Sequence, residues 1–383
     1  MDNSRKAVMI AAPVHPVPPR KGAAVEWWMY QVSRRLTGFE SHILCISTND
    51  YPDEERRDGI FFHRIRMGRL YKRLFQKITR LDPWSYARRA AALIDRIEPD
   101  IVHIHNAPRL IREIRAASRW RQARYILHMH NEMSVAPLGR DEVLIADSNY
   151  LKSWYAQQQP DANIVIMTNG VDTTLYQPAW TRTEHPRDHP AIPNLPADRK
   201  IILYVGRISP EKGPLDLTHA FRELLKLRRD VFLLLVGERR TGDTANRRVQ
   251  YGQELIDACE RMPGCCRHVG VIDPAEIHRI YPLADLLVVP SYFEEPFGMV
   301  AIEAMAAGIP VLAANRGGLR EFIIPHETGF LIADTRDYAG FARKMHELLD
   351  RPSELERVRR NARAYVEQHH GWETVTHQLE TLY

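Results

Sequence analysis

Two cations five residues apart follow a predicted strand and precede a predicted helix start. Arg207 and Lys212 both fall within residues 204–213, and a helix is expected to open near Gly213. An arginine can grip two oxygens of a diphosphate, a lysine acts as a point charge, and backbone N–H groups at a helix N-terminus complete such a site. The alternative is a solvated loop with ordinary surface charges. Taken alone, this segment fits a diphosphate site and a surface loop equally well.

Two carboxylates lie eight positions apart further along the chain. Glu295 lies in a loop after a strand that ends at Pro290, and Glu303 lies about one turn inside the next helix. A loop carboxylate can accept hydrogen bonds from sugar hydroxyls, and one near a helix start can reach a ribose. In the alternative, Glu303 only favours the helix dipole and Glu295 is solvated. The same helix start offers a phosphate the backbone N–H groups of Gly298, Met299 and Val300.

Strand-length apolar runs alternate with helical patterns along the chain, which predicts an α/β fold with parallel sheets covered by helices on both faces. In the first half, the predicted strands are Val8–Ala12, Ile43–Ser47, Ile60–Ile65, Ile101–His105, Tyr125–His130, Val143–Ala146 and Ile164–Met167. In the second half they are Ile201–Val205, Phe232–Val236, His268–Val271, Asp285–Pro290 and Pro310–Ala313. Apolar steps of three and four residues predict a helix through Val25, Trp28, Met29, Val32 and Leu36.

The organisation along the chain predicts two doubly wound domains. Residues 173–199 contain five prolines and no clear periodicity, and are interpreted as a linker. We therefore expect a first domain over 1–172, a second domain over 200–370, and a last segment, 371–383, that could cross back to the first domain. Ligands of open parallel sheets bind beyond the carboxyl ends of the strands, so two facing domains predict a cleft between them.

Composition restricts the classes of protein that fit. No apolar run approaches the ~18 residues of a membrane span, and the short apolar stretch at 7–12 is interpreted as a first strand, not a signal peptide. The four cysteines form no C-x-x-C pair and have no nearby histidine at zinc spacing, so we expect neither a disulfide framework nor a metal site. This cysteine usage fits a protein located in a reducing cytoplasm. Residues 1–170 carry 26 Lys+Arg against 18 Asp+Glu, and the first domain should face the more anionic partner.

The segment Arg64–Arg80 contains seven basic residues and no acidic one. Its leucines and isoleucine at four-residue steps predict a helix with an apolar stripe flanked by positive charge, which would let the protein lie at an anionic membrane surface. The alternative is a packed surface helix with a solvated basic face. The basic charge also suggests nucleic-acid binding as a function. The sequence contains no recognised nucleic-acid motif, however, so we expect no nucleic-acid partner.

Three motifs stand in order along the chain: N-G-V-D at Asn169–Asp172, G-R-x-x-x-x-K-G at Gly206–Gly213 and E-P-F-G-x-x-x-x-E-A-M-A-A-G-x-P-V at Glu295–Val311. With them the chain resembles the family 4 retaining glycosyltransferases over nearly its whole length. The resemblance implies a GT-B fold, two facing Rossmann-like domains with an interdomain cleft, and transfer of a sugar from a nucleoside diphosphate. Within the family, the segments Lys21–Trp28 and His128–Asn131 look most like enzymes that build lipopolysaccharide core or related surface glycans.

The resemblance also implies the catalytic roles. Arg207 and Lys212 would neutralise the diphosphate and stabilise charge on the leaving group, and Glu295 would hold hydroxyls of the donor sugar. His130, at the end of a first-domain strand, would lie near the donor sugar and the reacting centre. A buried, hydrogen-bonded core histidine is the alternative for His130.

Further donor contacts are implied at the ribose, the phosphates and the base. Glu303 would hold the ribose, and Gly22 would let its backbone approach the phosphates. Backbone groups of Arg267–Ile272, Val271 among them, would meet the base. Many family members have two adjacent glycines where this chain has Lys21-Gly22, which leaves the phosphate geometry open. A structural role is favoured for three residues at another strand end, His103, His105 and Asn106.

The predicted reaction is metal-independent transfer with retention. The sequence contains no D-x-D pair to hold a divalent cation, and cations and helix termini can supply that positive potential. We expect no cofactor. The donor is predicted to be a UDP-sugar carrying N-acetylglucosamine or glucose, and the acceptor a lipopolysaccharide core or another cell-envelope glycan or glycolipid. Two alternatives stay open: a GT-B sugar-nucleotide epimerase, and a non-catalytic protein that binds sugar nucleotides or glycans.

Overall fold

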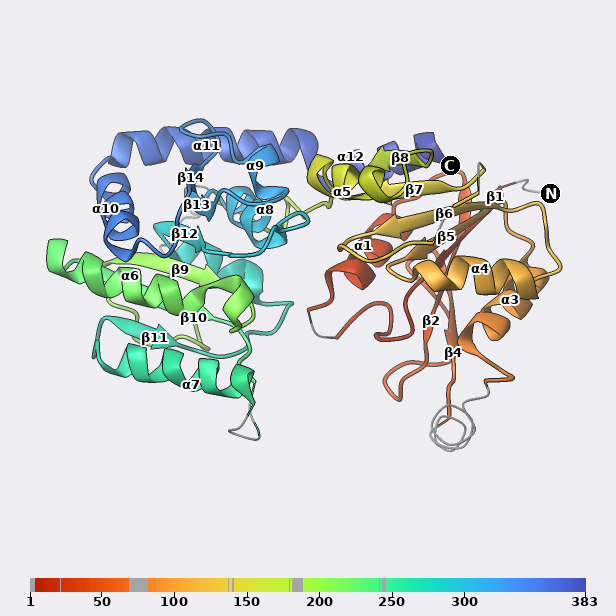
Figure 1. Cartoon of the computed structure of the whole chain (residues 1–383), viewed down its shortest axis with the longest axis horizontal. Helices are drawn as coiled ribbons and strands as arrows, with labels where there is room; N and C mark the ends of the chain where they lie inside the picture. The colour runs from red at the N-terminus through yellow and green to blue at the C-terminus, as the bar shows by residue number, and fades with distance from the viewer. Residues whose placement is uncertain are drawn as a thin grey trace. The chain divides into compact units, whose positions relative to one another are not determined.

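The computed structural model describes residues 4–20, 22–68, 82–136, 138–139, 141–178, 180, 189–240, 242 and 246–383 (Figure 1). The chain forms two compact units. The first contains Met1–Gly170 together with Trp372–Tyr383, and the second contains Val171–Gly371. No helix among the described residues is long and apolar enough to cross a membrane.

The first unit is built on an eight-stranded sheet in the order β3-β4-β2-β1-β5-β6-β7-β8. Every pairing is parallel except that of β3 with β4. The strands are β1 (Arg5–Ile10), β2 (Phe39–Ile46), β3 (Glu54–Arg57), β4 (Ile60–Ile65), β5 (Ile101–His105), β6 (Arg124–Met129), β7 (Val143–Ala146) and β8 (Asn163–Ile166). The chain crosses from one side of β1 to the other between β4 and β5, so β1 and β5 form the switch point of this sheet.

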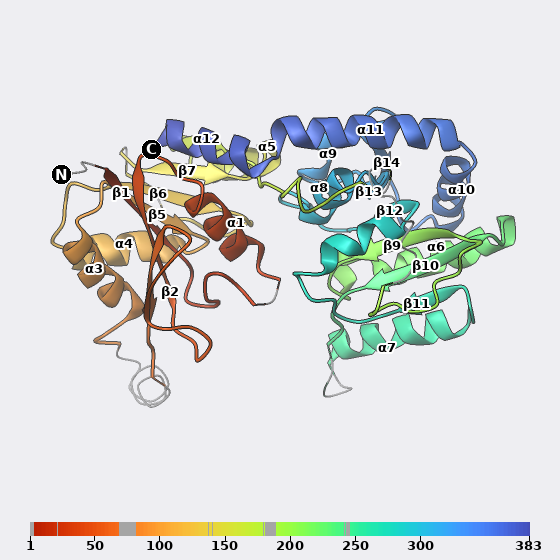
Figure 2. The same ribbon diagram turned by 180° about the vertical axis from the view of Figure 1, so that it is seen from behind.

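Helices cover both faces of the first sheet. One face packs against α3 (Tyr86–Ile97), α4 (Pro108–Ala117) and α5 (Asn149–Gln158), and the other against α1 (Ala24–Ser33) and α12 (Trp372–Leu382). Helix α3 begins where the Ser85 side chain accepts a hydrogen bond from the Arg88 N–H, which satisfies one of the free donors of a helix start. Helix α12 comes from the other end of the chain: Trp372, Val375 and Leu379 enter the core beside α1 (Figure 2).

The second unit has a six-stranded, fully parallel sheet in the order β11-β10-β9-β12-β13-β14. Numbered from its own first strand, this order is 3-2-1-4-5-6, that of a doubly wound dinucleotide-binding fold. The strands are β9 (Lys200–Val205), β10 (Val231–Val236), β11 (Cys266–His268), β12 (Leu286–Val289), β13 (Val311–Ala314) and β14 (Phe330–Ile332). Its switch point lies between β9 and β12, where a ligand of such a sheet binds.

Two layers of helices enclose the second sheet. One apolar core lies under α6 (Pro214–Leu227), α7 (Arg247–Glu260) and α10 (Tyr338–Leu349), and Figure 1 shows α6 and α10 close together. The other core contains α8 (Met299–Ala306), the short α9 (Leu319–Phe322) and part of α11 (Pro352–His369). The predicted α/β class with two Rossmann-like domains is confirmed, because each unit is a parallel sheet with helices on both faces.

Two details depart from the sequence-based expectations. The strand predicted over His268–Val271 is displaced, since β11 covers Cys266–His268 and Val271 lies in the following loop with 61% of its surface exposed. Residues 173–199 do not form a free linker in the part of the chain that is described. Tyr176, Ile192 and Leu195 are buried in the core of the second unit, and burial of these apolar side chains holds the segment there.

Most of the basic segment Arg64–Arg80 lies outside the described residues, because residues 69–81 are not among them. Arg64 is described and belongs to the core of the first unit: its guanidinium donates to the Pro52 and Val17 carbonyls and pairs with Glu55 at 2.9 Å. Arg64 therefore contributes no free charge to a surface. The predicted contact of the remaining segment with an anionic membrane stays a prediction.

Candidate donor-diphosphate site

The switch point of the second sheet gathers three of the predicted site residues. Arg207 and Lys212 follow β9, and Glu295 follows β12, the neighbouring strand. Because parallel strands point the same way, the residues after their carboxyl ends lie at one edge of the sheet. A short 3₁₀ turn at Pro210–Lys212 and helix α6 then carry the chain away from that edge.

Gly213 brings the loop after β9 against the end of β12. Its φ of +71° lies in the left-handed region that side chains disfavour. A Cβ at this position would lie 2.2 Å from the Pro290 carbonyl oxygen, which is backbone and cannot rotate away. Glycine therefore permits the close approach that places Lys212 beside the loop carrying Glu295.

Lys212 and Glu295 form an ion pair, although 83 positions separate them. The Lys212 ammonium lies 2.7 Å from Oε1 and 3.0 Å from Oε2 of Glu295, and the Ser291 hydroxyl donates to Oε1 at 2.6 Å. The Glu295 side chain is buried, and that of Lys212 is 23% exposed. A charge pair so little hydrated depends on both partners, because removal of one leaves the other buried and uncompensated. Glu295 is thus held by an ion pair and is not the solvated loop residue of the alternative.

The backbone of Glu295 is fixed as firmly as its side chain. Its carbonyl accepts a hydrogen bond from the Gly318 N–H at 2.7 Å. The preceding Glu294 instead pairs with Arg316 at 3.3 Å and Arg320 at 2.9 Å. The two adjacent acids therefore have separate partners, and Glu295 is the one that pairs with Lys212.

Helix α8 begins next to this pair and contains three predicted donor residues, and a fourth directly precedes it. Gly298 is the residue before its first turn, with a φ of +111°, and a Cβ there would lie 2.4 Å from Cδ2 of the buried Leu319. Met299 and Val300 follow in the first turn, whose backbone N–H groups have no partner within the helix. The start of α8 therefore presents the N–H groups and the positive end of the helix dipole that suit a phosphate.

Glu303 lies further inside α8 and is turned toward two tyrosines. The Tyr281 hydroxyl donates to its Oε2, and the Tyr176 hydroxyl also contacts the carboxyl group. Burial raises the pKa of Glu303 to about 7, against the smaller lowering effect of the tyrosine hydroxyls. A carboxyl group already hydrogen-bonded to hydroxyls can exchange one of them for a ribose hydroxyl.

The remaining second-unit residues lie apart from these contacts. The Arg207 side chain is 65% exposed, and its nearest ion-pair partner is Glu211 at 3.9 Å. Its carbonyl accepts a hydrogen bond from the buried Tyr204 hydroxyl at 2.7 Å, which fixes the backbone while the guanidinium stays in solvent. Val271 is exposed in the loop after β11.

His130 of the first unit lies at the end of β6, in a row of buried rings. Its Nδ1 lies 3.0 Å from Oδ2 of Asp147, and its backbone N–H donates to the Asn106 side chain at 2.8 Å. The other Asp147 oxygen lies 3.0 Å from Nε2 of His128, and Asn169 donates to Oδ2 at 2.9 Å. The structure therefore gives His130 the partners of a core histidine and also fixes the orientation of its ring.

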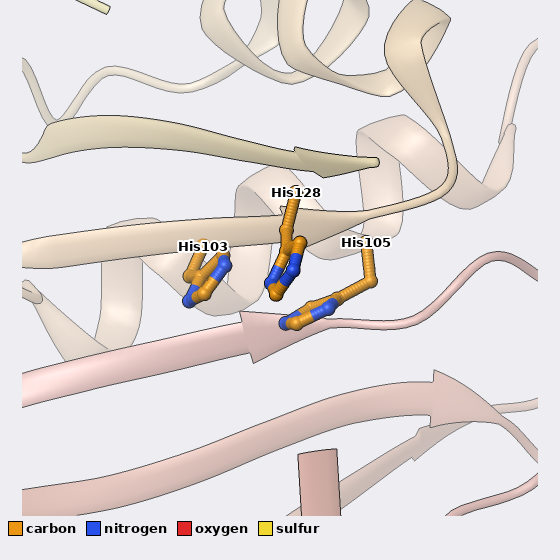
Figure 3. A group of neighbouring side chains, drawn as sticks. All are labelled: His103, His105 and His128. Carbon is orange, nitrogen blue, oxygen red and sulfur yellow. The ribbon is translucent and has the colours of Figure 1, made fainter. Parts of the chain in front are cut away.

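Three further histidines continue this row. His103, His105 and His128 are fully buried, and Figure 3 shows their rings projecting to the same side of their strands. Burial lowers the pKa of His103 to about 3 and those of His105 and His128 well below the usual value, so these rings are neutral. The structural role expected for His103 and His105 agrees with this burial.

The sequence matches the model of the family described as Glycosyltransferase Family 4 over residues 25–175, and that described as Glycosyl transferases group 1 over residues 187–365. It is 35% identical over 384 residues to the lipopolysaccharide 1,2-N-acetylglucosaminetransferase of Salmonella typhimurium strain LT2. That similarity covers 98% of this chain and 97% of the relative. The chain belongs to the family 4 glycosyltransferases.

Solved structures confirm the fold of this glycosyltransferase. It is similar to sucrose-phosphate synthase from Thermosynechococcus elongatus, with a TM-score of 0.80, 23% identity and coverage of 99% of this chain and 98% of the other. It is also similar to Anabaena HepE in complex with UDP and glucose, with a TM-score of 0.72, 18% identity and 98% coverage of each chain. These similarities confirm the GT-B fold with its two Rossmann-like domains.

Sequence reasoning missed several residues that contact or lie near the candidate site residues. Ser291 donates to Glu295, Asp147 contacts the His130 ring, and neither stands in a recognisable motif. Glu26 is buried in the first turn of α1, four residues after Gly22, and burial raises its pKa against the smaller lowering effect of a backbone hydrogen bond. An acidic residue closely following a glycine-bearing loop was the available signal for Glu26.

Proposed function

We propose that this glycosyltransferase moves a hexose or N-acetylhexosamine, with retention, from a UDP-sugar onto a lipopolysaccharide core or another cell-envelope glycan or glycolipid. N-acetylglucosamine and glucose are the sugars favoured. The relative named for transfer of N-acetylglucosamine to lipopolysaccharide supports the sugar and the acceptor class. HepE, solved with UDP and glucose, supports the uridine nucleotide.

The observation that carries the proposal is the Lys212–Glu295 pair at the switch point of the second sheet. A diphosphate beside Lys212 would share that cation with Glu295, and the exposed Arg207 guanidinium would take further phosphate oxygens. Glu295 would then accept hydroxyls of the sugar attached to the diphosphate. These residues would thus bind the diphosphate and the sugar of the donor, on either side of the bond that breaks.

The proposed mechanism assigns the protein a positioning and electrostatic role. Arg207, Lys212 and the start of α8 would stabilise the negative charge that develops on the departing UDP, which is the task a divalent cation performs in other transferases. The acceptor hydroxyl would attack from the face that UDP leaves, and a leaving-group phosphate oxygen would take its proton. His130, with its ring fixed by Asp147, would contact the donor sugar at the reacting carbon.

The test is turnover with defined donors and acceptors. The purified chain is incubated with UDP-N-acetylglucosamine, UDP-glucose or GDP-mannose and truncated lipopolysaccharide cores, and products are identified by mass and by the anomeric coupling constant. We expect an α-linked sugar from a UDP-donor, in the absence of added metal. A β-linked product would contradict retention, and transfer from GDP-mannose alone would contradict the uridine assignment.

The same assay separates the two alternatives. An epimerase would convert the sugar nucleotide without any acceptor, and a binding protein would bind the nucleotide and produce neither change. Arg207→Ala and Lys212→Ala should each lower kcat/KM, by about 2–4 kcal/mol of transition-state stabilisation. Unchanged kcat/KM in a folded double variant would rule out this site. Location at the cytoplasmic face of a membrane is part of the proposal and is tested separately by flotation with anionic liposomes.

A further inference from the structure

The row of four buried histidines, His103, His105, His128 and His130, lies on one face of the first sheet. His103 and His105 are two positions apart on β5, so their side chains lie on the same face of the strand. In the parallel register of β5 with β6, His105 lies opposite His128, and His130 follows two positions later. This spacing brings ring nitrogens from neighbouring strands together: one nitrogen from each of His103, His105 and His128 lies within 4.8 Å of the other two.

Each of these three histidines has one ring nitrogen that is hydrogen-bonded and one that is not. The hydrogen-bonded nitrogens have partners outside the group of three. His103 Nδ1 lies 2.7 Å from the Tyr383 hydroxyl, His105 Nδ1 lies 3.3 Å from His130 Nε2, and His128 Nε2 lies 3.0 Å from Asp147 Oδ1. The other nitrogens are fully buried and have no hydrogen-bond partner among the described residues: His103 Nε2, His105 Nε2 and His128 Nδ1.

The hydrogen bonds are consistent with one arrangement of protons when all four rings are neutral. The Asp147 carboxylate only accepts, so the neutral His128 ring carries its proton on Nε2 and its Nδ1 is a bare lone pair. Asp147 also accepts from His130 Nδ1, which leaves His130 Nε2 to accept from His105 Nδ1. His105 Nε2 is then a second bare lone pair. Two buried acceptors without a donor carry the full cost of desolvation unless something binds between them.

We propose that His103, His105 and His128 form a binding site for one first-row transition-metal ion of the Zn²⁺ class. Imidazole nitrogens are preferred ligands of such ions, and Zn²⁺ takes them at about 2.0–2.1 Å. Ligating histidines usually donate their other ring nitrogen to a carboxylate, carbonyl or similar partner, which is the pattern of the three outer contacts here. Lone pairs that converge on an ion lie in the ring planes, which are inclined by 12° to 38° in the structure, so binding turns the rings about Cβ–Cγ.

The burial of the group assigns the ion a structural task. All three rings are fully buried, and Trp28 packs against each of them with ring centroids 4.7 to 5.9 Å apart. An enclosed site suits an ion that stabilises the fold, whereas a catalytic ion keeps an open coordination position. The ion would link β5 to β6. Through the hydrogen bond between His103 and the Tyr383 hydroxyl, it would also link these strands to the residue after α12. This role is independent of the donor site in the second unit.

The experiment measures metal content and stability of the tag-free full chain. The protein is stripped with a chelator, equilibrated with Zn²⁺, freed of excess by gel filtration and analysed by mass spectrometry. We expect about one zinc per chain and a melting temperature several degrees above that of the stripped protein. Equilibration with Co²⁺ should give the visible absorption bands of a low-coordinate, nitrogen-ligated ion, which requires no variant. Less than 0.1 zinc per chain and no Co²⁺ bands in the wild type would overturn the proposal.

Matched variants place the ion. His103→Asn and His105→Asn should each weaken Zn²⁺ affinity at least tenfold, with retention of secondary structure checked by circular dichroism. His63→Asn is the control, because His63 stacks on His42 in the same sheet and belongs to no group of three possible metal ligands among the described residues. Zinc retained in both His103 and His105 variants, or lost equally in the control, would overturn the assignment. If a variant does not fold, the Co²⁺ bands and zinc content of the wild type decide.

Discussion

The Glu295 carboxylate is the residue whose loss should separate sugar transfer from nucleotide binding. Glu295→Gln keeps the shape of the side chain but removes the charge that Lys212 pairs with and the full acceptor capacity proposed for the sugar. We expect kcat/KM to fall roughly 100-fold or more, on the order of 3 kcal/mol, while affinity for free UDP changes only a few-fold. Steady-state kinetics and calorimetric titration with UDP measure the two effects.

Glu294→Gln is the matched control, because it removes the neighbouring acid, which pairs with Arg316 and Arg320 and not with Lys212. It should keep kcat/KM within about threefold of the wild type, as expected for a surface substitution. Equal losses in the two variants would place the effect in the fold of the loop, and the assignment of Glu295 to the sugar would be withdrawn.

Glu303 should make the second unit less stable as the pH rises. Its folded pKa of about 7 lies above the ordinary value of 4.5, so its contribution to stability is fully present below pH 4.5 and is lost as pH rises to about 7. The expected loss is on the order of 3 kcal/mol. Urea midpoints at pH 4.5, 6 and 7.5 should therefore fall more steeply for the wild type than for Glu303→Gln, which cannot ionise. Parallel profiles would show that the carboxyl group does not titrate in this window.

Asp147 positions the His130 ring, so replacing Asp147 by asparagine should change the tautomer of His130. In Asp147→Asn, an amide NH₂ can face His130 Nδ1, which would then accept and carry its proton on Nε2. We expect kcat to fall roughly 10- to 100-fold, as for other groups that orient a functional histidine, with UDP affinity retained. Nitrogen-15 chemical shifts of the His130 ring report the tautomer directly. A slower enzyme with an unchanged tautomer would limit Asp147 to a structural role.

At the scale of the elements, two glycines permit the close approach of neighbouring segments. Gly213→Ala would place a Cβ against the Pro290 carbonyl, and Gly298→Ala would place one against buried Leu319, both at positive φ. We expect losses in unfolding free energy on the order of 2–5 kcal/mol for each, larger at Gly213, because a carbonyl moves less easily than a leucine methyl group. Thermal unfolding measures the effect. Gly22→Ala is the control, since its Cβ would meet nothing within 4 Å, and an equal loss there would refute the steric reasoning.

The buried parallel strands were predicted to within a few residues at each end, because strands covered on both faces appear in the sequence as continuous apolar runs. Strand β3 escaped detection: Glu54–Arg57 consists of four charged residues at the sheet edge, mostly in solvent, and carries no apolar pattern. The short β14 was also missed. Motif resemblance supplied Lys212 and Glu295 separately, but their pairing depends on β9 lying beside β12, a long-range order that local spacing does not contain.

At the scale of the whole molecule, turnover should not depend on Mg²⁺ or Mn²⁺. In the proposed mechanism Arg207, Lys212 and the start of α8 compensate the charge of the departing diphosphate. We expect kcat to change by less than twofold between enzyme assayed in excess EDTA and the same enzyme after either ion is added in excess over the EDTA. An increase of tenfold or more with Mg²⁺ would contradict this mechanism. A slow loss in EDTA that only Zn²⁺ reverses would instead reflect the histidine site of the first unit.

The position of α12 in the first unit has a consequence for synthesis of the chain. Residues 372–383 leave the ribosome after the whole second unit, yet Trp372, Val375 and Leu379 complete the core beside Trp28 and Val32. At typical translation rates the intervening stretch of about 200 residues takes roughly 10–40 s to make. During that interval the first unit has an open apolar face, so the unit made first is the one that finishes folding last, and nascent chains paused within the second unit should be bound by chaperones along α1.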